Sequence, residues 1–173
     1  MTDPEPGPAD LKPGPDGQLN AADRDWLGQA IELSRRCPPS ASAYCVGAVL
    51  VSRDGTVLAT GFSRERDPHH HAEEAALARV DPADPRLTAA TLYSSLEPCR
   101  FRASRPVPCA ELIIQAGLRR VVVAWLEPPV LAPGGGAELL RDGGVTVLEV
   151  PELAAEARAV NAAVLGGAAR GED

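Results

Sequence analysis

The chain has 173 residues, of which 45% are hydrophobic and 24% are charged. This length and composition predict one globular domain with its own core, and they exclude a fibrous or wholly disordered chain. The net charge of −7 and the 3% of aromatic residues are not typical of nucleic-acid-binding proteins. The longest apolar run, residues 121–126, is too short to span a membrane, and the acidic, Pro-rich start is unlike a signal peptide. We therefore expect a cytoplasmic protein that binds neither nucleic acid nor membranes.

Both ends of the chain are predicted to be tails. Residues 1–20 contain five prolines and three glycines in a polar setting, a composition that buries too little apolar surface to offset the entropy of ordering. The last residues have a similar composition. We expect a disordered Pro-rich tail over residues 1–20, a folded domain over residues 21–165 and a flexible C-terminal tail over residues 166–173.

The folded part is predicted to begin with a helix and a hairpin. Asn20 can cap a helix over residues 21–36. Residues 46–52 and 56–62 are rich in β-branched and apolar side chains, and the turn signal Arg53-Asp54-Gly55 lies between them. This pattern predicts two antiparallel strands.

Helices and strands alternate in the remaining chain. The expected helices cover residues 71–80, 109–117, 136–141 and 151–165, and the expected strands cover residues 90–95, 121–125 and 145–150. Strands that are separated by helices pair in parallel through right-handed crossovers. The fold class is therefore α/β: a three-layer α/β/α sandwich around a five-stranded mixed sheet, made of a β-hairpin and three parallel strands.

Two short motifs carry the candidate chemistry. His71 and Glu73 lie at the start of a predicted helix, and Cys99 and Cys109 each follow a proline around the next strand-to-helix junction. One imidazole and two thiolates suit tetrahedral Zn²⁺, and three protein ligands leave a fourth position for a catalytic water. A lone His-x-Glu is common, and a cysteine is often just a small buried hydrophobe. The order of the four residues, however, matches zinc-dependent base deaminases, in which the glutamate is a non-ligand acid and base.

The two remaining cysteines have weaker assignments. Without an export signal, all four cysteines are expected to be thiols or metal ligands rather than disulfides. Cys45 opens the first predicted strand near the expected pocket and is a candidate substrate contact, whereas Cys37 ends the first helix and is expected to be inert. His69 and His70 are expected to be loop residues.

Five stretches follow the pattern of a known enzyme family. They are Val46-Gly47-Ala48-Val49, His71-Ala72-Glu73, Leu96-Glu97-Pro98-Cys99, the run from Pro108 to Ile114, and Ala116-Gly117 leading into Val121-Val122-Val123-Ala124. With them, residues 20–164 resemble the deaminase domain of bacterial bifunctional riboflavin biosynthesis enzymes, within the cytidine deaminase-like superfamily. The resemblance implies a cytidine deaminase-like fold, a Zn²⁺ cofactor, hydrolytic deamination in which zinc activates water and Glu73 moves protons, and a homo-oligomer, with a dimer favoured.

The sequence departs from this family in four places. Ala43-Tyr44-Cys45 replaces the usual Asn-Pro-x, so a substrate-contacting amide is missing. Nine residues separate Cys99 from Cys109, one more than expected, and Glu127-Pro128-Pro129-Val130 stands where the family has Asp-Pro-Asn-Pro. The reductase domain that follows in the bifunctional enzymes is not in this sequence.

Arginines between the two cysteines are candidate phosphate ligands. Arg100, Arg102 and Arg105 lie there, and Arg64 and Arg66 precede His71. An arginine fork binds phosphate at two points. Of the 17 basic residues only Lys12 is a lysine, so any polar loop would collect arginines; Arg105 is preferred because the resembled family has Arg or Lys there. The glycines at 134–136 lack a following Lys-Ser/Thr, and they predict a turn that lets a helix start near the sheet rather than a phosphate loop.

These observations predict a zinc-dependent hydrolytic deaminase of an aminated pyrimidine, and the resemblance points to a ribosylaminopyrimidine phosphate. Two alternatives stay open: a deaminase of a nucleoside, nucleotide or other aminated heterocycle, and a non-catalytic zinc-fold subunit. The retention of Glu73 counts against the last, because a structural zinc site does not use it.

Overall fold

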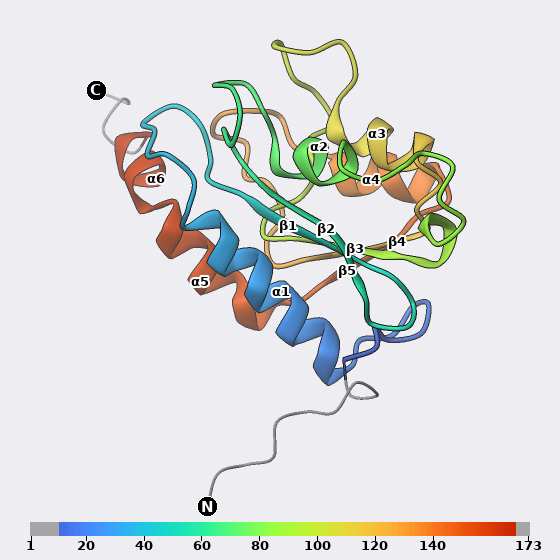
Figure 1. The fold of residues 1–173 in the computed structure, drawn as a ribbon. Coiled ribbons are helices and arrows are strands. Elements are labelled where there is room, and N and C mark those ends of the chain that lie inside the picture. The colour runs from blue at the N-terminus through green and yellow to red at the C-terminus, as the bar shows by residue number, and fades with distance from the viewer. Residues whose placement is uncertain (1–10, 169–173) are drawn as a thin grey trace, which may run out of the picture.

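The computed structural model describes residues 11–168 as an α/β fold built around one five-stranded sheet (Figure 1). The strands are β1 (Gly47–Val51), β2 (Val57–Phe62), β3 (Thr91–Ser94), β4 (Arg120–Val123) and β5 (Thr146–Glu149). The helices are α1 (Ala21–Ser34), α2 (Ala72–Leu77), α3 (Cys109–Gln115), α4 (Gly136–Asp142), α5 (Ala154–Val160) and α6 (Ala162–Ala168), with single 3₁₀ turns at Leu87–Ala89 and Pro151–Leu153.

The sheet has the mixed topology predicted from the sequence. Its strand order is β2-β1-β3-β4-β5. β1 pairs antiparallel with both β2 and β3, whereas β3, β4 and β5 are mutually parallel. The hairpin and the three crossover-linked strands are therefore confirmed.

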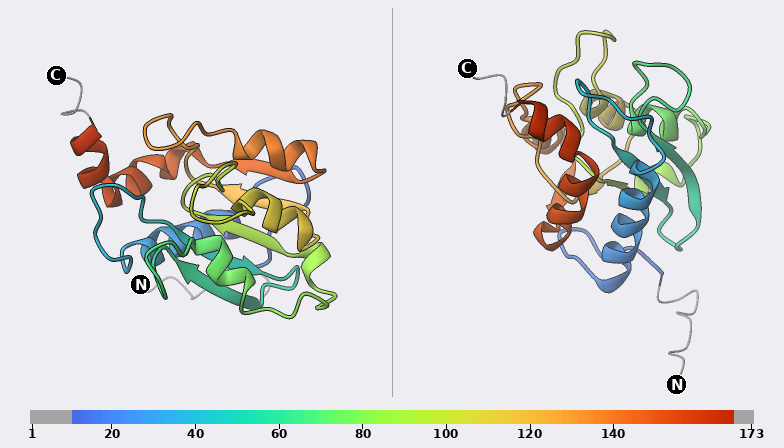
Figure 2. Two further views of the ribbon diagram at one scale, coloured as in Figure 1. Left: turned by 90° about the horizontal axis from the view of Figure 1, so that it is seen from above. Right: turned by 90° about the vertical axis from the view of Figure 1, so that its left-hand side faces the viewer.

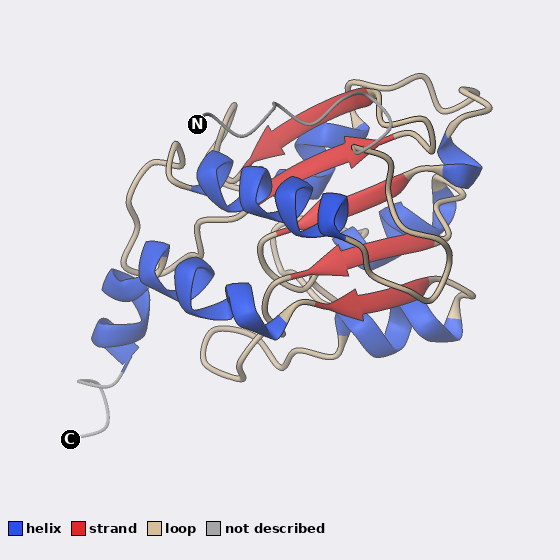
Figure 3. Ribbon diagram, turned by 90° about the horizontal axis from the view of Figure 1, so that it is seen from below, coloured by secondary structure: helices blue, strands red, loops and turns tan. Residues whose placement is uncertain are grey.

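Helices cover both faces of the sheet and complete three layers. Figure 3 shows α1 and α5 in front of the sheet and α2, α3 and α4 behind it. β1, β3 and β4 are buried along their whole length, as expected for central strands between two helical layers. A side chain at Gly61 of β2 would place its Cβ 2.4 Å from the carbonyl oxygen of Ala72. The glycine thus lets the first turn of α2 lie directly on the sheet.

The predicted C-terminal helix is interrupted. The expected single helix over residues 151–165 is a 3₁₀ turn followed by α5 and α6, which are separated at Asn161 and drawn as distinct coils in Figure 2. α6 continues to residue 168, so residues 166–168 are helical where a flexible tail was expected, and residues 169–173 lie outside the described part. The side-chain amide of Asn161 accounts for the break, because it binds main-chain groups of Ala157 and Cys45. Within residues 11–168, no helix combines the length and apolar character needed to cross a bilayer.

Residues 11–20 pack on the domain, in contrast to the disordered tail expected over residues 1–20. The indole Nε1 of Trp26 donates to the carbonyl of Leu11 at 2.7 Å, and the N–H of Gly14 lies 3.2 Å from the carboxylate of Asp23. Asn20 caps α1 in a reciprocal capping box with Asp23, as its sequence position predicts. Hydrogen-bond partners for its main-chain groups and the packing of half-buried Leu11 and Leu19 on the core order this segment. Residues 1–10 of the same predicted tail lie outside the described residues.

Candidate active site

Three possible metal ligands converge at one end of the sheet. His71 precedes α2, Cys99 lies in the loop after β3, and Cys109 is the first residue of α3. The His71 Nδ1 atom is 3.6 Å from the Sγ of Cys99 and 3.4 Å from the Sγ of Cys109. All three donor atoms lie within 4.8 Å of one another. One imidazole nitrogen and two sulfurs facing a common point fit the donor chemistry of tetrahedral zinc.

The start of α3 joins the two cysteines. The main-chain N–H of Cys109 donates to the Sγ of Cys99 at 3.3 Å. A side-chain hydrogen bond with Cys109 lowers the pKa of the Cys99 thiol to about 4, and this bond between the two cysteine side chains, together with burial, raises the pKa of Cys109. Cys99 is therefore a thiolate near neutral pH, the form in which cysteine binds metals.

A glycine turn and a glutamate fix the loop that carries Cys99. A side chain at Gly136 would place its Cβ 1.7 Å from the carbonyl oxygen of Pro98, so α4 begins in direct contact with this loop. The carboxylate of Glu97 accepts the N–H of Glu127 at 2.7 Å and the N–H of Ala137 at 2.6 Å. The glycines at 134–136 therefore provide a close-packed helix start, as the sequence predicted.

Glu73 is a buried carboxylic acid beside the three donors. Its exposed fraction is 3%, and the Ser94 hydroxyl donates to its Oε1 at 2.9 Å. Burial raises the pKa of Glu73 above its usual value, while the charges of nearby His71 and Cys99 act in opposite directions. A raised pKa makes a carboxyl better suited to hold and pass on a proton, which is what a general acid and base does.

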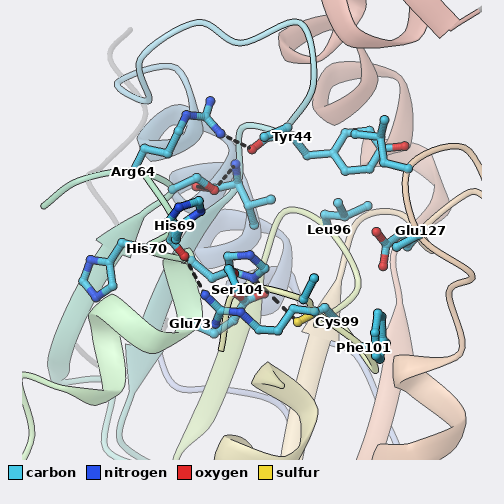
Figure 4. Close-up of a pocket in the computed structure, with 18 of the residues that line it drawn as sticks. Tyr44, Arg64, His69, His70, Glu73, Leu96, Cys99, Phe101, Ser104 and Glu127 are labelled. Carbon is cyan, nitrogen blue, oxygen red and sulfur yellow. Dashed lines mark hydrogen bonds between the residues drawn. The ribbon is translucent and has the colours of Figure 1, made fainter. Parts of the chain in front are cut away.

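A pocket of about 420 Å³ opens over Glu73 and Cys99 (Figure 4). Four segments form its wall: residues 42–46, 63–73, 96–104 and 127–132. Its volume lies within the range of small-molecule sites. The pocket is therefore large enough for a heterocycle that carries a further substituent.

Two further residues line the pocket wall. Burial together with the negative charges of Cys99 and Glu97 raises the pKa of Glu127 to about 7. Arg64 lines the side opposite Glu127 and donates to the carbonyl of Tyr44 at 3.1 Å (Figure 4). The sequence showed Glu127 only as a departure from the family pattern, and it marked Arg64 as one of the two arginines before His71.

The four candidate substrate ligands have different surroundings. Arg102 lines the pocket, but its guanidinium binds Glu74 and the carbonyl of His69. Arg105 binds Glu74 through Nε at 3.2 Å and Asp67 through Nη2 at 2.8 Å.

The other two candidates, Arg100 and Cys45, do not line the pocket. Arg100 lies 3.8 Å from the carboxylate of Glu138, and both side chains are more than half exposed. The Sγ of Cys45 is directed at Arg64 and at the carbonyls of Cys37 and Pro38. Of the described arginines, those that line the pocket are Arg64 and Arg102.

A known protein family matches the part of the chain that contains this site. The model of the cytidine and deoxycytidylate deaminase zinc-binding region matches residues 20–125, a range that includes the three donors and Glu73. The chain belongs to this deaminase family. The matched region is a zinc-binding one, and the cluster of His71, Cys99 and Cys109 within it is consistent with zinc.

Individual relatives extend the similarity within the deaminase family. The diaminohydroxyphosphoribosylamino-pyrimidine deaminase of Schizosaccharomyces pombe is 38% identical over 128 residues, or 72% of this chain and 31% of that protein. The riboflavin biosynthesis protein RibD of Aquifex aeolicus is 41% identical over 147 residues, or 83% of this chain and 38% of that protein. The structure of Acinetobacter baumannii RibD, form 2, superposes with a TM-score of 0.70 at 31% identity, covering 86% of this chain and 40% of that one. The chain thus spans only 31% to 38% of the length of these two curated relatives.

Proposed function

We propose that this chain is a zinc-dependent hydrolytic deaminase of an aminated pyrimidine. The observation that carries the proposal is the buried carboxyl of Glu73 beside the cluster of His71, Cys99 and Cys109, at the floor of the pocket. A structural zinc site has no use for such a carboxyl, so its presence disfavours a non-catalytic zinc-fold subunit.

The residues of the site divide the chemical work. His71, Cys99 and Cys109 would hold a zinc ion, which would supply a Lewis acid to activate water for attack on the amine-bearing ring carbon. Glu73 takes a proton from the water and delivers it to the ring nitrogen. It then takes the second proton from the hydroxyl now bound to the ring carbon and delivers it to the amino group, so that the C–N bond breaks and ammonia leaves. Ser94 fixes the orientation of this carboxyl through its hydrogen bond to Oε1. Such an acid–base shuttle contributes roughly 10² to 10⁴-fold to the rate.

The proposed substrate is a ribosylaminopyrimidine phosphate. Its support is the set of relatives, which includes the diaminohydroxyphosphoribosylamino-pyrimidine deaminase of Schizosaccharomyces pombe and RibD proteins. The pocket volume of about 420 Å³ suits a ring with an attached sugar. Ala43 lies on the pocket wall where the resembled family has an amide that contacts the substrate. A nucleoside, nucleotide or other aminated heterocycle is therefore kept as a second candidate substrate.

The decisive experiment measures ammonia release from a panel of aminated pyrimidines and purines, with and without phosphate, by the purified zinc-loaded chain. We expect turnover of at least one pyrimidine. Glu73→Gln should keep zinc and fold but lose at least about 100-fold in turnover, because an amide binds water without moving protons. Glu111→Gln, at an exposed position in the first turn of α3, is the matched control.

Metal analysis of the same proteins tests the zinc ligands. We expect about one zinc ion per chain in the wild type and in Glu73→Gln, and a loss of zinc in Cys109→Ser. Full zinc content in Cys109→Ser would contradict the ligand set, and wild-type turnover in Glu73→Gln would leave another base or a scaffold role as the better account. Sedimentation of the same samples tests the further proposal, made from the family resemblance, that the protein is a homodimer.

A further inference from the structure

Two further cysteine sulfur atoms lie close together, away from the donor atoms of His71, Cys99 and Cys109. Cys37 follows the end of α1, Cys45 precedes β1, and Arg64 belongs to the loop after β2. The Nη2 atom of Arg64 lies 2.8 Å from the Sγ of Cys37 and 3.2 Å from the Sγ of Cys45. One guanidinium nitrogen therefore bridges two thiols that are eight positions apart in the sequence.

The backbone holds both cysteines in place. The N–H of Cys37 donates to the carbonyl of Ser34 in the last turn of α1 at 3.2 Å. The N–H and the carbonyl of Cys45 both bind the side-chain amide of Asn161, at 2.7 and 3.0 Å. The juxtaposition of the thiols is thus fixed from two sides, while most of the seven residues between them are partly or fully exposed.

The two thiols are chemically unequal. A hydrogen bond from Cys37 and the positive charge of Arg64 lower the pKa of Cys45 to about 7, whereas the same bond and burial raise the pKa of Cys37. Cys45 is therefore the more acidic thiol of the pair, and Cys37 the one that keeps its proton. A low-pKa cysteine next to a second cysteine and an arginine is the arrangement found in redox-sensitive dithiols.

We propose that Cys37 and Cys45 form a redox-active dithiol that hydrogen peroxide converts to a disulfide. The Cys45 thiolate attacks one peroxide oxygen, the O–O bond breaks, and after protonation the products are a Cys45 sulfenic acid and water. The Cys37 sulfur then attacks the Cys45 sulfur, the S–O bond breaks, and the hydroxyl leaves as a second water with the Cys37 proton. Two thiols are oxidised by two electrons and one hydrogen peroxide is reduced.

The site is independent of the proposed deaminase chemistry but adjoins its pocket. Besides the two sulfurs, Arg64 binds the carbonyl of Tyr44, and both residues line the pocket (Figure 4). A neutral disulfide is a weaker acceptor than a thiolate. Oxidation therefore removes a charge-assisted partner of Arg64 at the pocket wall.

The zinc-loaded full chain offers a direct test. After exposure to hydrogen peroxide, the remaining thiols are alkylated and the chain is cut with trypsin without reduction. Cleavage after Arg36 and Arg53 puts both cysteines in one peptide, residues 37–53, separate from the peptides that contain Cys99 and Cys109. We expect this peptide to lose two hydrogen atoms, to escape alkylation, and to regain both thiols on reduction. If it stays a fully alkylated dithiol at peroxide doses that oxidise free glutathione, the proposal is wrong.

Variants test the roles assigned to each residue. In Cys37→Ser, a sulfenic acid at Cys45 should persist and react with dimedone, because no thiol resolves it. Arg64→Gln should slow alkylation of Cys45 at neutral pH by about threefold or more, because the thiolate fraction falls; Arg66→Gln, in the exposed part of the same loop, should leave it unchanged. Trapping at Cys37 rather than Cys45, or equal alkylation rates in both arginine variants, would overturn the assignment.

Discussion

The guanidinium of Arg102 lies 3.9 Å from the Sγ of Cys109, with Nη1 as the donor. The Arg102 side chain is only 3% exposed and forms an ion pair with Glu74 at 3.1 Å. It also donates to the carbonyl of His69. Arg102 therefore contacts Cys109, one of the proposed zinc ligands, and its charge is already paired with Glu74.

We expect Arg102→Met to weaken zinc binding. A thiolate that accepts a charge-assisted hydrogen bond is stabilised in its metal-binding form, and loss of such outer partners costs about 10 to 100-fold in metal affinity. Competition with a chromogenic chelator measures the change. Arg100→Met, which removes a guanidinium at the protein surface, is the control, and equal zinc affinity in the two variants would refute the supporting role.

Arg105 is the candidate for binding a substrate phosphate. Its Nη2 pairs with Asp67, whose side chain is 42% exposed, so a phosphate can replace this carboxylate while Nε keeps Glu74. Arg105→Ala should raise the KM of a phosphorylated substrate about tenfold, and hardly change that of the dephosphorylated form. Steady-state kinetics on both forms, with Arg100→Ala as control, checks this. Equal effects on the two substrates would remove phosphate from the proposal.

Glu127 should make the stability of the metal-free chain depend on pH. Its pKa of about 7 in the folded state lies above the usual 4.5, so the folded state keeps a proton that the unfolded state has released. The free energy of unfolding therefore falls as pH rises from 4.5 through 7. Glutamine has no carboxyl to titrate, so Glu127→Gln does not show this fall in the free energy of unfolding. The variant should be more stable than the wild type by about 1 kcal/mol near pH 8, but not near pH 5.

Urea unfolding of the metal-free proteins at these two pH values measures the difference. Glu149→Gln, at an exposed position at the end of β5, should show no such divergence. If Glu127→Gln gave the same stability change at both pH values, the raised pKa would be refuted.

The buried ion pair of Asp23 and Arg120, at the end of the sheet opposite the pocket, should contribute strongly to the free energy of unfolding. Asp23 is fully buried and binds Arg120 at 2.8 and 2.9 Å and the Tyr93 hydroxyl at 2.6 Å. Asp23→Asn leaves the Arg120 charge uncompensated and should cost about 3 kcal/mol or more of the free energy of unfolding. Asp25→Asn, exposed in the same helix, should cost little.

Acid should remove the same contribution. Burial alone would raise the pKa of Asp23, but the hydrogen bonds from Arg120 and Tyr93 lower it overall from its usual 3.8. The stabilisation is complete above 3.8 and is lost as pH falls through the lower folded-state pKa. Thermal melts of wild type and Asp23→Asn should therefore converge at strongly acidic pH, and a constant gap would contradict this account.

The elements and the donor cluster could be predicted because local sequence encodes them. Hydrophobic periodicity and turn residues mark the strands of the hairpin, and the helix starts at His71 and Cys109 are marked by short motifs. The parallel pairing of β3, β4 and β5 followed from the rule that strands separated by helices are joined by right-handed crossovers. Each of these patterns lies within a few residues of sequence, so it can be recognised without knowing the fold.

Contacts between distant segments could not be predicted in the same way. The partners of Arg105 lie 31 and 38 positions away, and those of Asn161 include a residue 116 positions away. Composition also misled for residues 11–20, where low hydrophobicity predicted disorder but main-chain hydrogen bonds to α1 hold the segment. Which arginine meets which carboxylate is decided by packing, and a single sequence carries no signal for it.

The amide of Asn161 gives Cys45 what a neighbouring strand would otherwise supply. It accepts the N–H and donates to the C=O of the same residue, the pair of bonds that an antiparallel partner makes. A side chain at the junction of α5 and α6 thereby continues the extended chain to Cys45, two residues before the start of β1 at Gly47. Local opening of these helices should release Cys45 and, with it, the neighbouring Tyr44 of the pocket wall. Amide hydrogen exchange at Cys45 should therefore follow that of the C-terminal helices rather than that of the central sheet.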